Sequence, residues 1–277
     1  MLQQFKVALA QINCKVGDKK HNLKLMEEKI RQAKEKGAKL IVFPELALTG
    51  YMCQDLFYEV AEPVPGPATN QLQKIAESEK IFVVFGVPER SLRAQALLYN
   101  TAVLIGPNGI LGKYRKIHLP SHSVFDEKRY FRPGCEIPIF RTEIGNIGLI
   151  VCYDLFFPEI TRILKLKGAQ LVVCISASPA VRRGFFETFL SARAMENTIF
   201  IVYTNLVGTE DGLQFWGGSR IIAPNGDLIA KAEYEKEDFI IGEIDYTHLK
   251  QAEAFIPTLK DLKIELFDSL RENAKKL

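Results

Sequence analysis

The sequence predicts an α/β fold, a four-layer α-β-β-α sandwich built from two pseudo-symmetric halves. Uninterrupted apolar strands, intervening helical patterns and an internal repeat support this fold. The repeat consists of three pairs of similar segments that occur in the same order in each half of the chain. The pairs are KEKGAKLIV at 34–42 and KLKGAQLVV at 165–173, IFVVF at 81–85 and IFIVY at 199–203, and IGPNGIL at 105–111 and IAPNGDL at 222–228.

The individual elements follow from local patterns. A helix is expected over 19–36, because apolar residues recur at helical spacing from Leu23 to Ala33, and Gly37 ends it before the strand KLIVF. Each Pro-Asn-Gly segment is expected to turn a β-hairpin. The helices would cover the outer faces of two sheets. Further strands are expected at 81–87, 101–105, 147–151, 171–175, 199–203 and 239–244.

No linker divides the two halves, so we expect a single domain over 1–277 with a C-terminal helical tail from about 257. Leu262, Leu266 and Leu270 lie at helical spacing in a highly charged segment, which predicts an amphipathic helix. This helix could dock on its own domain or contact a second copy of the chain.

The overall composition is that of an ordinary globular chain. Of 277 residues, 47% are apolar and 25% are charged, with a formal net charge of +3. This balance gives no reason to expect a nucleic-acid partner or an anionic membrane surface. No apolar run reaches the roughly 18 residues of a membrane span, and the N-terminal segment lacks a signal-peptide pattern, so we expect a cytoplasmic protein.

The five cysteines are spread along the chain without a CxxC pair. Their odd number and wide spacing argue against a disulfide framework and against a zinc site. We therefore expect reduced thiols.

Three segments place a reactive side chain just after an apolar strand. They deliver Glu45, Lys116 and Cys152, and the carboxyl ends of strands are where sites collect in such sheets. Each residue alone has an ordinary structural interpretation: an internal salt bridge, a surface lysine and a buried thiol. Together they suggest a constellation in which the cation lowers the thiol pKa and the carboxylate moves protons.

The residues after Cys152 favour a nucleophile at this position. Pro158 and Glu159 suit the first turn of a helix. A strand-to-helix turn exposes the side chain and offers backbone N–H groups to a developing oxyanion.

The blocks FPELALTGY, YRKIHLP and CYDLFFPE, in this order, resemble the nitrilase superfamily of carbon–nitrogen hydrolases. NTAVLIGPNG, ARAMEN and GGSRIIAPNG fit the same family, so the resemblance covers nearly the whole chain. PELALTGYMCQDLF and HLPSHSVFDEKRYFRPG are additionally similar to the glutaminase domain of glutamine-dependent NAD synthetase.

The resemblance implies a role for each matching residue. Glu45 matches the general base, Lys116 the lysine, Cys152 the nucleophile and Glu127 a second glutamate that positions the site. The Tyr153 backbone N–H would help hold the oxyanion. The resemblance further implies the same sandwich fold, no metal or organic cofactor, and a homodimer or higher homo-oligomer.

The expected function is therefore a cysteine-dependent amidase that hydrolyses a small amide to a carboxylate and ammonia through a thioester. A nitrilase, an N-carbamoyl amidohydrolase and a glutaminase would use the same constellation. A competing enzyme mechanism pairs Cys152 with His118 or His122, because histidine is the commoner general base. The alternative outside enzymes is an inert binding scaffold.

Aromatic residues near the nucleophile are candidates for the substrate pocket. Tyr51, Phe156 and Phe157 could form its walls or could serve as ordinary core packing. Many family members have arginine at the position of Phe156, and phenylalanine there argues against a carboxylate clamp at this position.

Ser178, Arg182 and Arg183 follow the strand at 171–175, in a region that lines substrate pockets in the family. Ser178 and Arg182 are our candidates for substrate binding. If either arginine points inward, a carboxylated amide such as glutamine becomes a suitable substrate.

Overall fold

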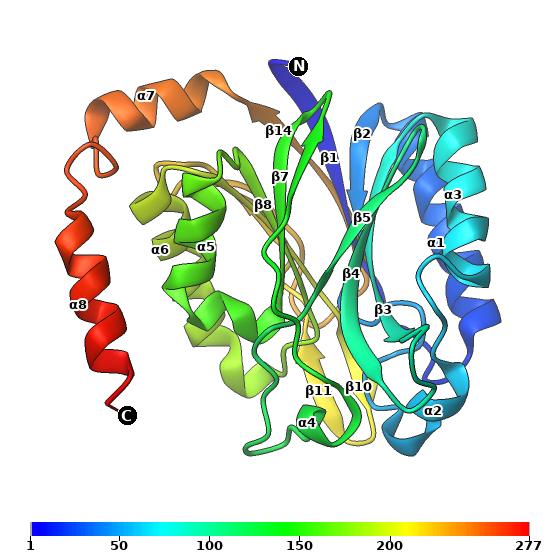
Figure 1. Cartoon of the computed structure of the whole chain (residues 1–277). Coiled ribbons are helices and arrows are strands. Elements are labelled where there is room, and N and C mark those ends of the chain that lie inside the picture. The colour runs from blue at the N-terminus through cyan, green and yellow to red at the C-terminus, as the bar shows by residue number, and fades with distance from the viewer. Residues whose placement is uncertain (1, 277) are drawn as a thin grey trace.

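Two six-stranded sheets pack face to face between two layers of helices in the computed structural model, which describes residues 2–276 (Figure 1). The first sheet contains β1 (Gln4–Gln11), β2 (Ala38–Val42), β3 (Phe82–Arg90), β4 (Leu98–Gly106), β5 (Gly109–Arg115) and β14 (Asp238–Asp245). The second contains β6 (Ile139–Thr142), β7 (Gly145–Val151), β8 (Leu171–Ser176), β9 (Phe200–Asn205), β12 (Arg220–Ile222) and β13 (Leu228–Lys231).

A separate ribbon is formed by β10 (Val207–Glu210) and β11 (Leu213–Trp216). The helices are α1 (Lys19–Glu35), α2 (Phe57–Val60), α3 (Pro67–Glu79), α4 (Glu127–Tyr130), α5 (Pro158–Leu166), α6 (Arg183–Asn197), α7 (Thr247–Phe255) and α8 (Ile264–Ala274). Short 3-10 helices are η1 (Gln54–Leu56), η2 (Cys152–Phe156) and η3 (Ala180–Arg182). Figure 1 shows α1 and α3 over the first sheet and α5 and α6 over the second.

The two sheets share one topology. Their strand orders are β14-β1-β2-β3-β4-β5 and β6-β7-β8-β9-β12-β13. In each order the first pair is antiparallel, the next two pairs are parallel and the last two are antiparallel. The repeated segments fall on equivalent elements, and each Pro-Asn-Gly segment turns an antiparallel hairpin. The predicted α-β-β-α sandwich of two similar halves is confirmed.

The inner strands are apolar without interruption because both of their faces are buried. In β1, Val7 and Leu9 belong to the core between the sheets, whereas Ala8 and Ala10 pack in the layer that contains Met26 of α1. This alternation follows from the two-residue period of a strand. Full burial of a side chain such as leucine contributes about 1.5–3 kcal/mol, so these positions stabilise both interfaces of the sheet.

The β10–β11 ribbon was not among the predicted elements. Its turn residues, Asp211 and Gly212, both have positive φ values, at 47° and 75°. A two-residue turn of this kind favours Asp-Gly, so the dipeptide was an available signal for the hairpin.

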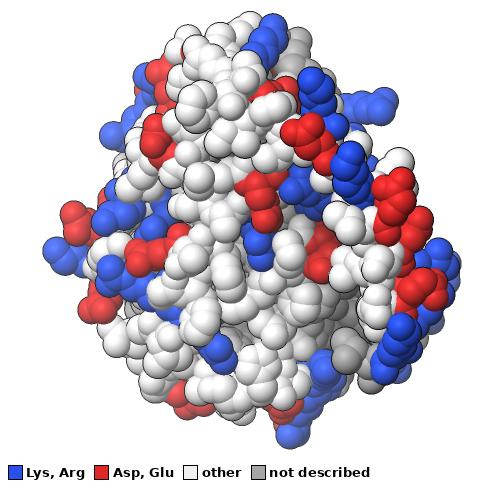
Figure 2. Space-filling view, turned by 90° about the vertical axis from the view of Figure 1, so that its left-hand side faces the viewer, with Lys and Arg blue, Asp and Glu red and all other residues white. Residues whose placement is uncertain are grey.

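The C-terminal segment extends away from the sandwich (Figure 1). The helix α8 buries none of its residues, and Leu266 and Leu270 are exposed. On the face that carries α7 and α8, acidic and basic side chains are interspersed around uncharged surface (Figure 2). Docking of this helix on its own domain is thus not seen. A contact with a second copy, like the count of one domain, stays a prediction.

Within residues 2–276, every helix is too short or too polar to cross a membrane.

Gly86 of β3 fits the backbone of the segment that follows β2. A Cβ atom at Gly86 would collide with the Leu46 backbone nitrogen and would lie 2.8 Å from the Glu45 Cα atom. The backbone of Gly86 also donates to the Pro44 carbonyl oxygen at 3.2 Å. Only glycine allows this close approach, which fixes the position of Glu45.

We predict that Gly86→Ala lowers the free energy of unfolding by about 1–3 kcal/mol, because the added methyl group forces the backbone apart. Chemical denaturation measures this difference. Gly184→Ala is the matched control, since a Cβ atom there has nothing within 4 Å. Equal stability of the two variants would contradict the proposed close approach.

Candidate active site

The topology brings several strand ends to one edge of the sandwich. β2 and β3 are parallel, β4 runs back from this edge, and β5 returns to it. Glu45 therefore follows β2, and Lys116 follows β5, at the same edge of the first sheet. Cys152 follows β7 in the facing sheet. The structure thus brings the three reactive residues to one end of the molecule.

The Lys116 side chain is fully buried and pairs with two carboxylates. Its Nζ donates to Glu45 Oε1 at 2.7 Å and to Glu127 Oε1 at 2.6 Å. Burial alone would lower the Lys116 pKa, but the carboxylates of Glu127 and Glu45 outweigh it and raise the pKa above its ordinary value. The lysine is therefore a permanent cation inside the protein.

Glu45 is also fully buried and accepts three hydrogen bonds. Besides Lys116, the donors are Asn100 Nδ2 to Oε1 and the Ala177 backbone N–H to Oε2, each at 2.7 Å. Ala177 directly follows β8, so the carboxylate connects the two sheets. Such contacts hold the side chain in one orientation beside Lys116.

Glu127 begins α4 and is buried. Its Oε1 accepts from the Tyr51 hydroxyl at 2.7 Å as well as from Lys116, whereas its Oε2 has no partner among the described residues. Burial raises the Glu127 pKa to about 7, opposed by Lys116 and assisted by the negative charge of Glu45. The carboxyl group can therefore change protonation state near neutral pH.

Cys152 is the first residue of η2 and has a φ value of 49°. This left-handed conformation costs a residue other than glycine about 1–2 kcal/mol. Burial raises the pKa of the Cys152 thiol well above its ordinary value, Glu45 raises it further, and Lys116 lowers it. Lys116 thus acts on the thiol pKa in the expected direction, but burial and the Glu45 carboxylate outweigh it, so the net shift is upward.

Asp154 holds the turn that carries Cys152. Its Oδ2 accepts from the Tyr114 hydroxyl at 2.8 Å and from the Val151 backbone N–H at 3.2 Å. Its Oδ1 contacts the backbone nitrogen and Nδ1 of His118, both at 2.9 Å. Asp154 is fully buried, so these contacts fix the turn from within.

The two histidines considered as alternative bases lie in different surroundings. His118 is engaged by Asp154. His122 lines the same small cavity as Cys152, but within residues 2–276 neither histidine is hydrogen-bonded to the cysteine sulfur.

The cavity at Cys152 is small, ≈ 20 Å³. Tyr153 and three of the predicted substrate-binding residues, Phe156, Ser178 and Arg182, line it. The buried Ser178 Oγ has no hydrogen-bond partner among the described residues. Phe156 thus gives the cavity an apolar wall, and the Ser178 hydroxyl and the Arg182 guanidinium give it two polar groups.

The two neighbouring arginines differ. Arg182 lines the cavity, and no described carboxylate lies within ion-pair distance of it. Arg183 pairs with Glu187 at 3.4 Å and lies over the Tyr234 ring at 3.6 Å from its centroid. Arg182 is thus the arginine of the two that lines the cavity of the nucleophile.

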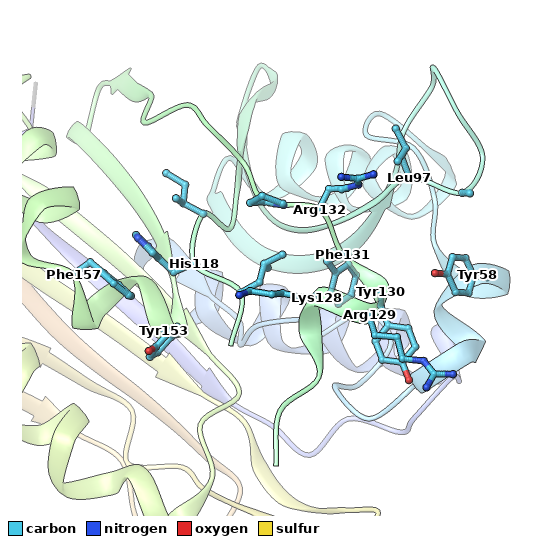
Figure 3. A pocket seen from close by; sticks show the side chains of 14 residues that line it. Tyr58, Leu97, His118, Lys128, Arg129, Tyr130, Phe131, Arg132, Tyr153 and Phe157 are labelled. Atoms are coloured by element: carbon cyan, nitrogen blue, oxygen red, sulfur yellow. The ribbon is translucent and has the colours of Figure 1, made fainter. Parts of the chain in front are cut away.

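The other two predicted substrate-binding residues, Tyr51 and Phe157, line different cavities. Tyr51 and Glu127 face a cavity of ≈ 320 Å³. Phe157 stacks on the His118 ring, with 3.4 Å between centroids, in the wall of a cavity of ≈ 820 Å³ (Figure 3). Neither side chain lines the cavity at Cys152.

Sequence reasoning missed Asn100, Tyr114 and Asp154 as parts of the site. Asn100 and Asp154 lie in the family blocks NTAVLIGPNG and CYDLFFPE. A polar residue at the start of an apolar strand or in a buried turn was the available signal, because it needs a partner.

Among residues 2–276, no group of three or more His, Cys, Asp or Glu side chains is arranged to hold a metal ion.

Comparison with known proteins identifies the class that this fold and site define. Residues 6–254 match the Carbon-nitrogen hydrolase family. The chain belongs to this family, within the nitrilase superfamily, and is a carbon–nitrogen hydrolase of the amidase and nitrilase type.

Three relatives illustrate the range of the family. A probable nitrilase of Schizosaccharomyces pombe is 36% identical over 249 residues, which are 88% of this chain and 90% of the relative. Human omega-amidase is 31% identical over 280 residues, 96% and 98% of the two chains. The glutamine-dependent NAD(+) synthetase of Aquifex aeolicus is 35% identical over 253 residues, 88% of this chain but 43% of the synthetase.

Solved structures share the fold. A carbon-nitrogen hydrolase from Helicobacter pylori G27 superposes with a TM-score of 0.86 at 27% identity and covers 96% of this chain and 98% of its own. A Glu-to-Gln variant of the amidase from Nesterenkonia sp. AN1 gives a TM-score of 0.82 at 28% identity, with 96% of each chain covered. In that variant, the acetamide moiety of fluoroacetamide is covalently attached to the active-site cysteine.

We predict that Tyr51→Phe shifts the acid limb of the pH profile of kcat/KM to higher pH. The Tyr51 hydroxyl lowers the Glu127 pKa by its hydrogen bond, so its removal raises this pKa above about 7. Less Glu127 is then ionised at a given pH. A hydrogen bond to a charged group is worth about 1.5–3 kcal/mol, so the shift should approach one pH unit or more.

Tyr58→Phe is the control, because Tyr58 is 41% exposed and its hydroxyl makes no hydrogen bond with a described carboxylate. An acid limb that stays in place in Tyr51→Phe would show that Glu127 does not govern it.

Proposed function

We propose that this chain is a cysteine-dependent amidase that hydrolyses a small amide to a carboxylate and ammonia through a thioester. The observation that carries this proposal is the buried cluster in which Lys116 pairs with Glu45 and Glu127, at the edge of the sandwich where β7 presents Cys152. A lysine held between two carboxylates, beside a thiol with a raised pKa, is suited to transferring a proton during nucleophilic attack.

In the first step, the Cys152 sulfur attacks the amide carbon while its proton passes to Glu45. The thiol is neutral at rest, since burial raises its pKa, so a base must act at the moment of attack. The developing oxyanion lies between the Lys116 ammonium and the Tyr153 backbone N–H. The N–H groups at a helix start have no partner within the helix, which leaves this donor available.

In the second step, the carbon–nitrogen bond breaks and Glu45 returns its proton to the leaving nitrogen, which departs as ammonia. Water then attacks the thioester and gives a proton to Glu45. The carbon–sulfur bond breaks, the proton on Glu45 returns to the Cys152 sulfur, and the product leaves as a carboxylic acid that gives its remaining proton to solvent. One carboxylate therefore serves as base and acid in turn.

Glu127 has a supporting role in this mechanism. Its Oε1 is committed to Lys116 and Tyr51, but its Oε2 is buried without a partner in the described structure. A buried carboxylate oxygen without a donor is costly. Glu127 acts on the reaction through Lys116, which it holds beside Glu45.

Known relatives support this chemistry. In the Glu-to-Gln variant of the amidase from Nesterenkonia sp. AN1, the active-site cysteine carries the acetamide moiety of fluoroacetamide as a covalent addition. Human omega-amidase is similar over nearly the full length of both chains. Nitriles and carbamoyl compounds remain the competing substrates for the same constellation.

We predict that Glu45→Gln lowers kcat for amide hydrolysis by at least about 100-fold, because general acid–base catalysis contributes about 10²–10⁴-fold. The substitution keeps the shape of the side chain, so the fold should be retained. Ammonia release measures the rate, and Glu59→Gln, which changes an exposed glutamate on α2, is the control.

Stoichiometric labelling of Cys152 by iodoacetamide, blocked by the amide, separates an enzyme from a binding scaffold. Full ammonia release by Glu45→Gln would remove Glu45 from the mechanism.

For the substrate, we propose a small amide that carries a carboxylate at its far end. Arg182 lines the cavity at Cys152 and is without a carboxylate partner among residues 2–276. Ser178 Oγ supplies a second polar group, and Phe156 supplies an apolar wall. A carboxylate near Arg182 would complete a charge-assisted hydrogen bond.

We predict that Arg182→Ala raises KM for succinamate by about 10–100-fold, the equivalent of a lost charge-assisted hydrogen bond. The KM for butyramide, a neutral amide of similar size, should stay within a factor of two or so. Arg183→Ala is the matched control, because Arg183 is paired with Glu187.

Ammonia release is measured for both amides, a nitrile and a carbamoyl compound. Equal effects of Arg182→Ala on both amides would contradict the carboxylate contact. Faster ammonia release from the nitrile or the carbamoyl compound than from the amides would show that this compound class, and not the amide, is the substrate.

A further inference from the structure

A second cavity, of ≈ 820 Å³, lies beside the catalytic one. Tyr153 lines both cavities. The larger cavity is not lined by Glu45, Lys116 or Cys152. Figure 3 shows His118, Tyr153 and Phe157 at one end and Tyr58 and Tyr130 at the other, with Lys128 and Arg132 between them. Its volume falls in the range of about 300–1,000 Å³ that is typical of small-molecule sites.

The charged groups of this cavity have one sign. Lys128, Arg129 and Arg132 line it, together with His118, and none of the lining residues is an aspartate or glutamate. Arg129 pairs with Asp55 at 3.4 Å. Lys128 and Arg132 have no carboxylate within ion-pair distance in the described part of the chain. Two cations without counter-ions, in a concave site, attract an anion.

The catalytic end of the cavity is an aromatic wall, formed by His118, Tyr153 and Phe157. The His118 and Phe157 rings are stacked at an interplanar angle of 6°, and Tyr153 meets Phe157 edge to face, with 5.3 Å between centroids. The contact with Asp154 holds His118 in place. A rigid aromatic surface of this kind binds a planar ring with little loss of side-chain entropy.

We propose that this cavity is a binding site for a small anion that carries a planar ring. The anionic group lies against Lys128 and Arg132, and the ring packs on the aromatic wall. The site is separate from the cavity at Cys152, because Tyr153 is the one residue that appears in both linings. The inference does not depend on the amidase mechanism.

Calorimetric titration with adenosine monophosphate, adenosine and inorganic phosphate tests the two halves of this recognition. Adenosine monophosphate should bind at least 10-fold more tightly than either adenosine or phosphate, because only it uses the cations and the aromatic wall together. Its affinity should fall as salt is added, since the cations are exposed. Equal affinity for adenosine monophosphate and phosphate would mean that the aromatic wall takes no part, and would overturn the proposal.

The double variant Lys128→Glu/Arg132→Glu should lose at least 10-fold in affinity for adenosine monophosphate. Lys20→Glu/Lys36→Glu makes the same change of net charge on exposed lysines elsewhere and should keep the affinity. Thermal unfolding checks that both variants fold. If the charge reversal unfolds the chain, the single variants Lys128→Ala and Arg132→Ala replace it. If the folded variants at Lys128 and Arg132 keep the affinity for adenosine monophosphate, these cations do not bind the anion and the proposal is overturned.

Competition experiments separate the two cavities. Adenosine monophosphate should bind the Cys152→Ala variant as tightly as the unaltered chain, and saturating succinamate should leave its affinity unchanged. Displacement by succinamate would place the anion in the catalytic pocket and overturn a separate site. The binding of adenosine monophosphate is measured without amide hydrolysis. The anion site can therefore be confirmed or overturned whether or not the chain proves to be an amidase.

Discussion

The buried ammonium group of Lys116 is the constraint on which the rest of the site depends. A fully buried cation is tolerated only with partners, and removing one partner of a buried pair costs about 3–5 kcal/mol. The partners here are Glu45 and Glu127, at 2.7 and 2.6 Å. Glu45 in turn accepts the Ala177 N–H from the facing sheet at 2.7 Å. The lysine thus determines how the strand ends of both sheets meet.

Much of this arrangement could be predicted from the sequence. The internal repeat predicted two similar sheets, because similar segments in the same order must fold into similar units. Apolar strands followed at once by Glu45, Lys116 and Cys152 predicted that reactive groups lie at strand ends. These inferences succeed because they depend on local periodicity and on the rule that strand ends collect functional groups.

The contacts that complete the site could not be predicted in this way. Asn100 reaches Glu45 across 55 residues, and Ala177 reaches it across 132. Nothing in the local pattern pairs such positions. The net direction of the thiol pKa shift could not be predicted for a related reason: charge type can be read from the sequence, but depth of burial cannot. Since burial is the largest influence on the Cys152 pKa, the sign of the shift depended on packing.

In the proposed mechanism, the second carboxylate keeps Lys116 paired while Glu45 is protonated. When Glu45 takes the thiol proton it becomes neutral, and Lys116 would be left as an isolated buried cation if it had no other partner. Glu127 remains as its counter-ion. The negative charge of Glu45 is one cause of the raised Glu127 pKa, so neutralising Glu45 favours the ionised form of Glu127. The cluster therefore moves charge toward the oxyanion without creating new charge in the interior, where an unpaired charge is most costly.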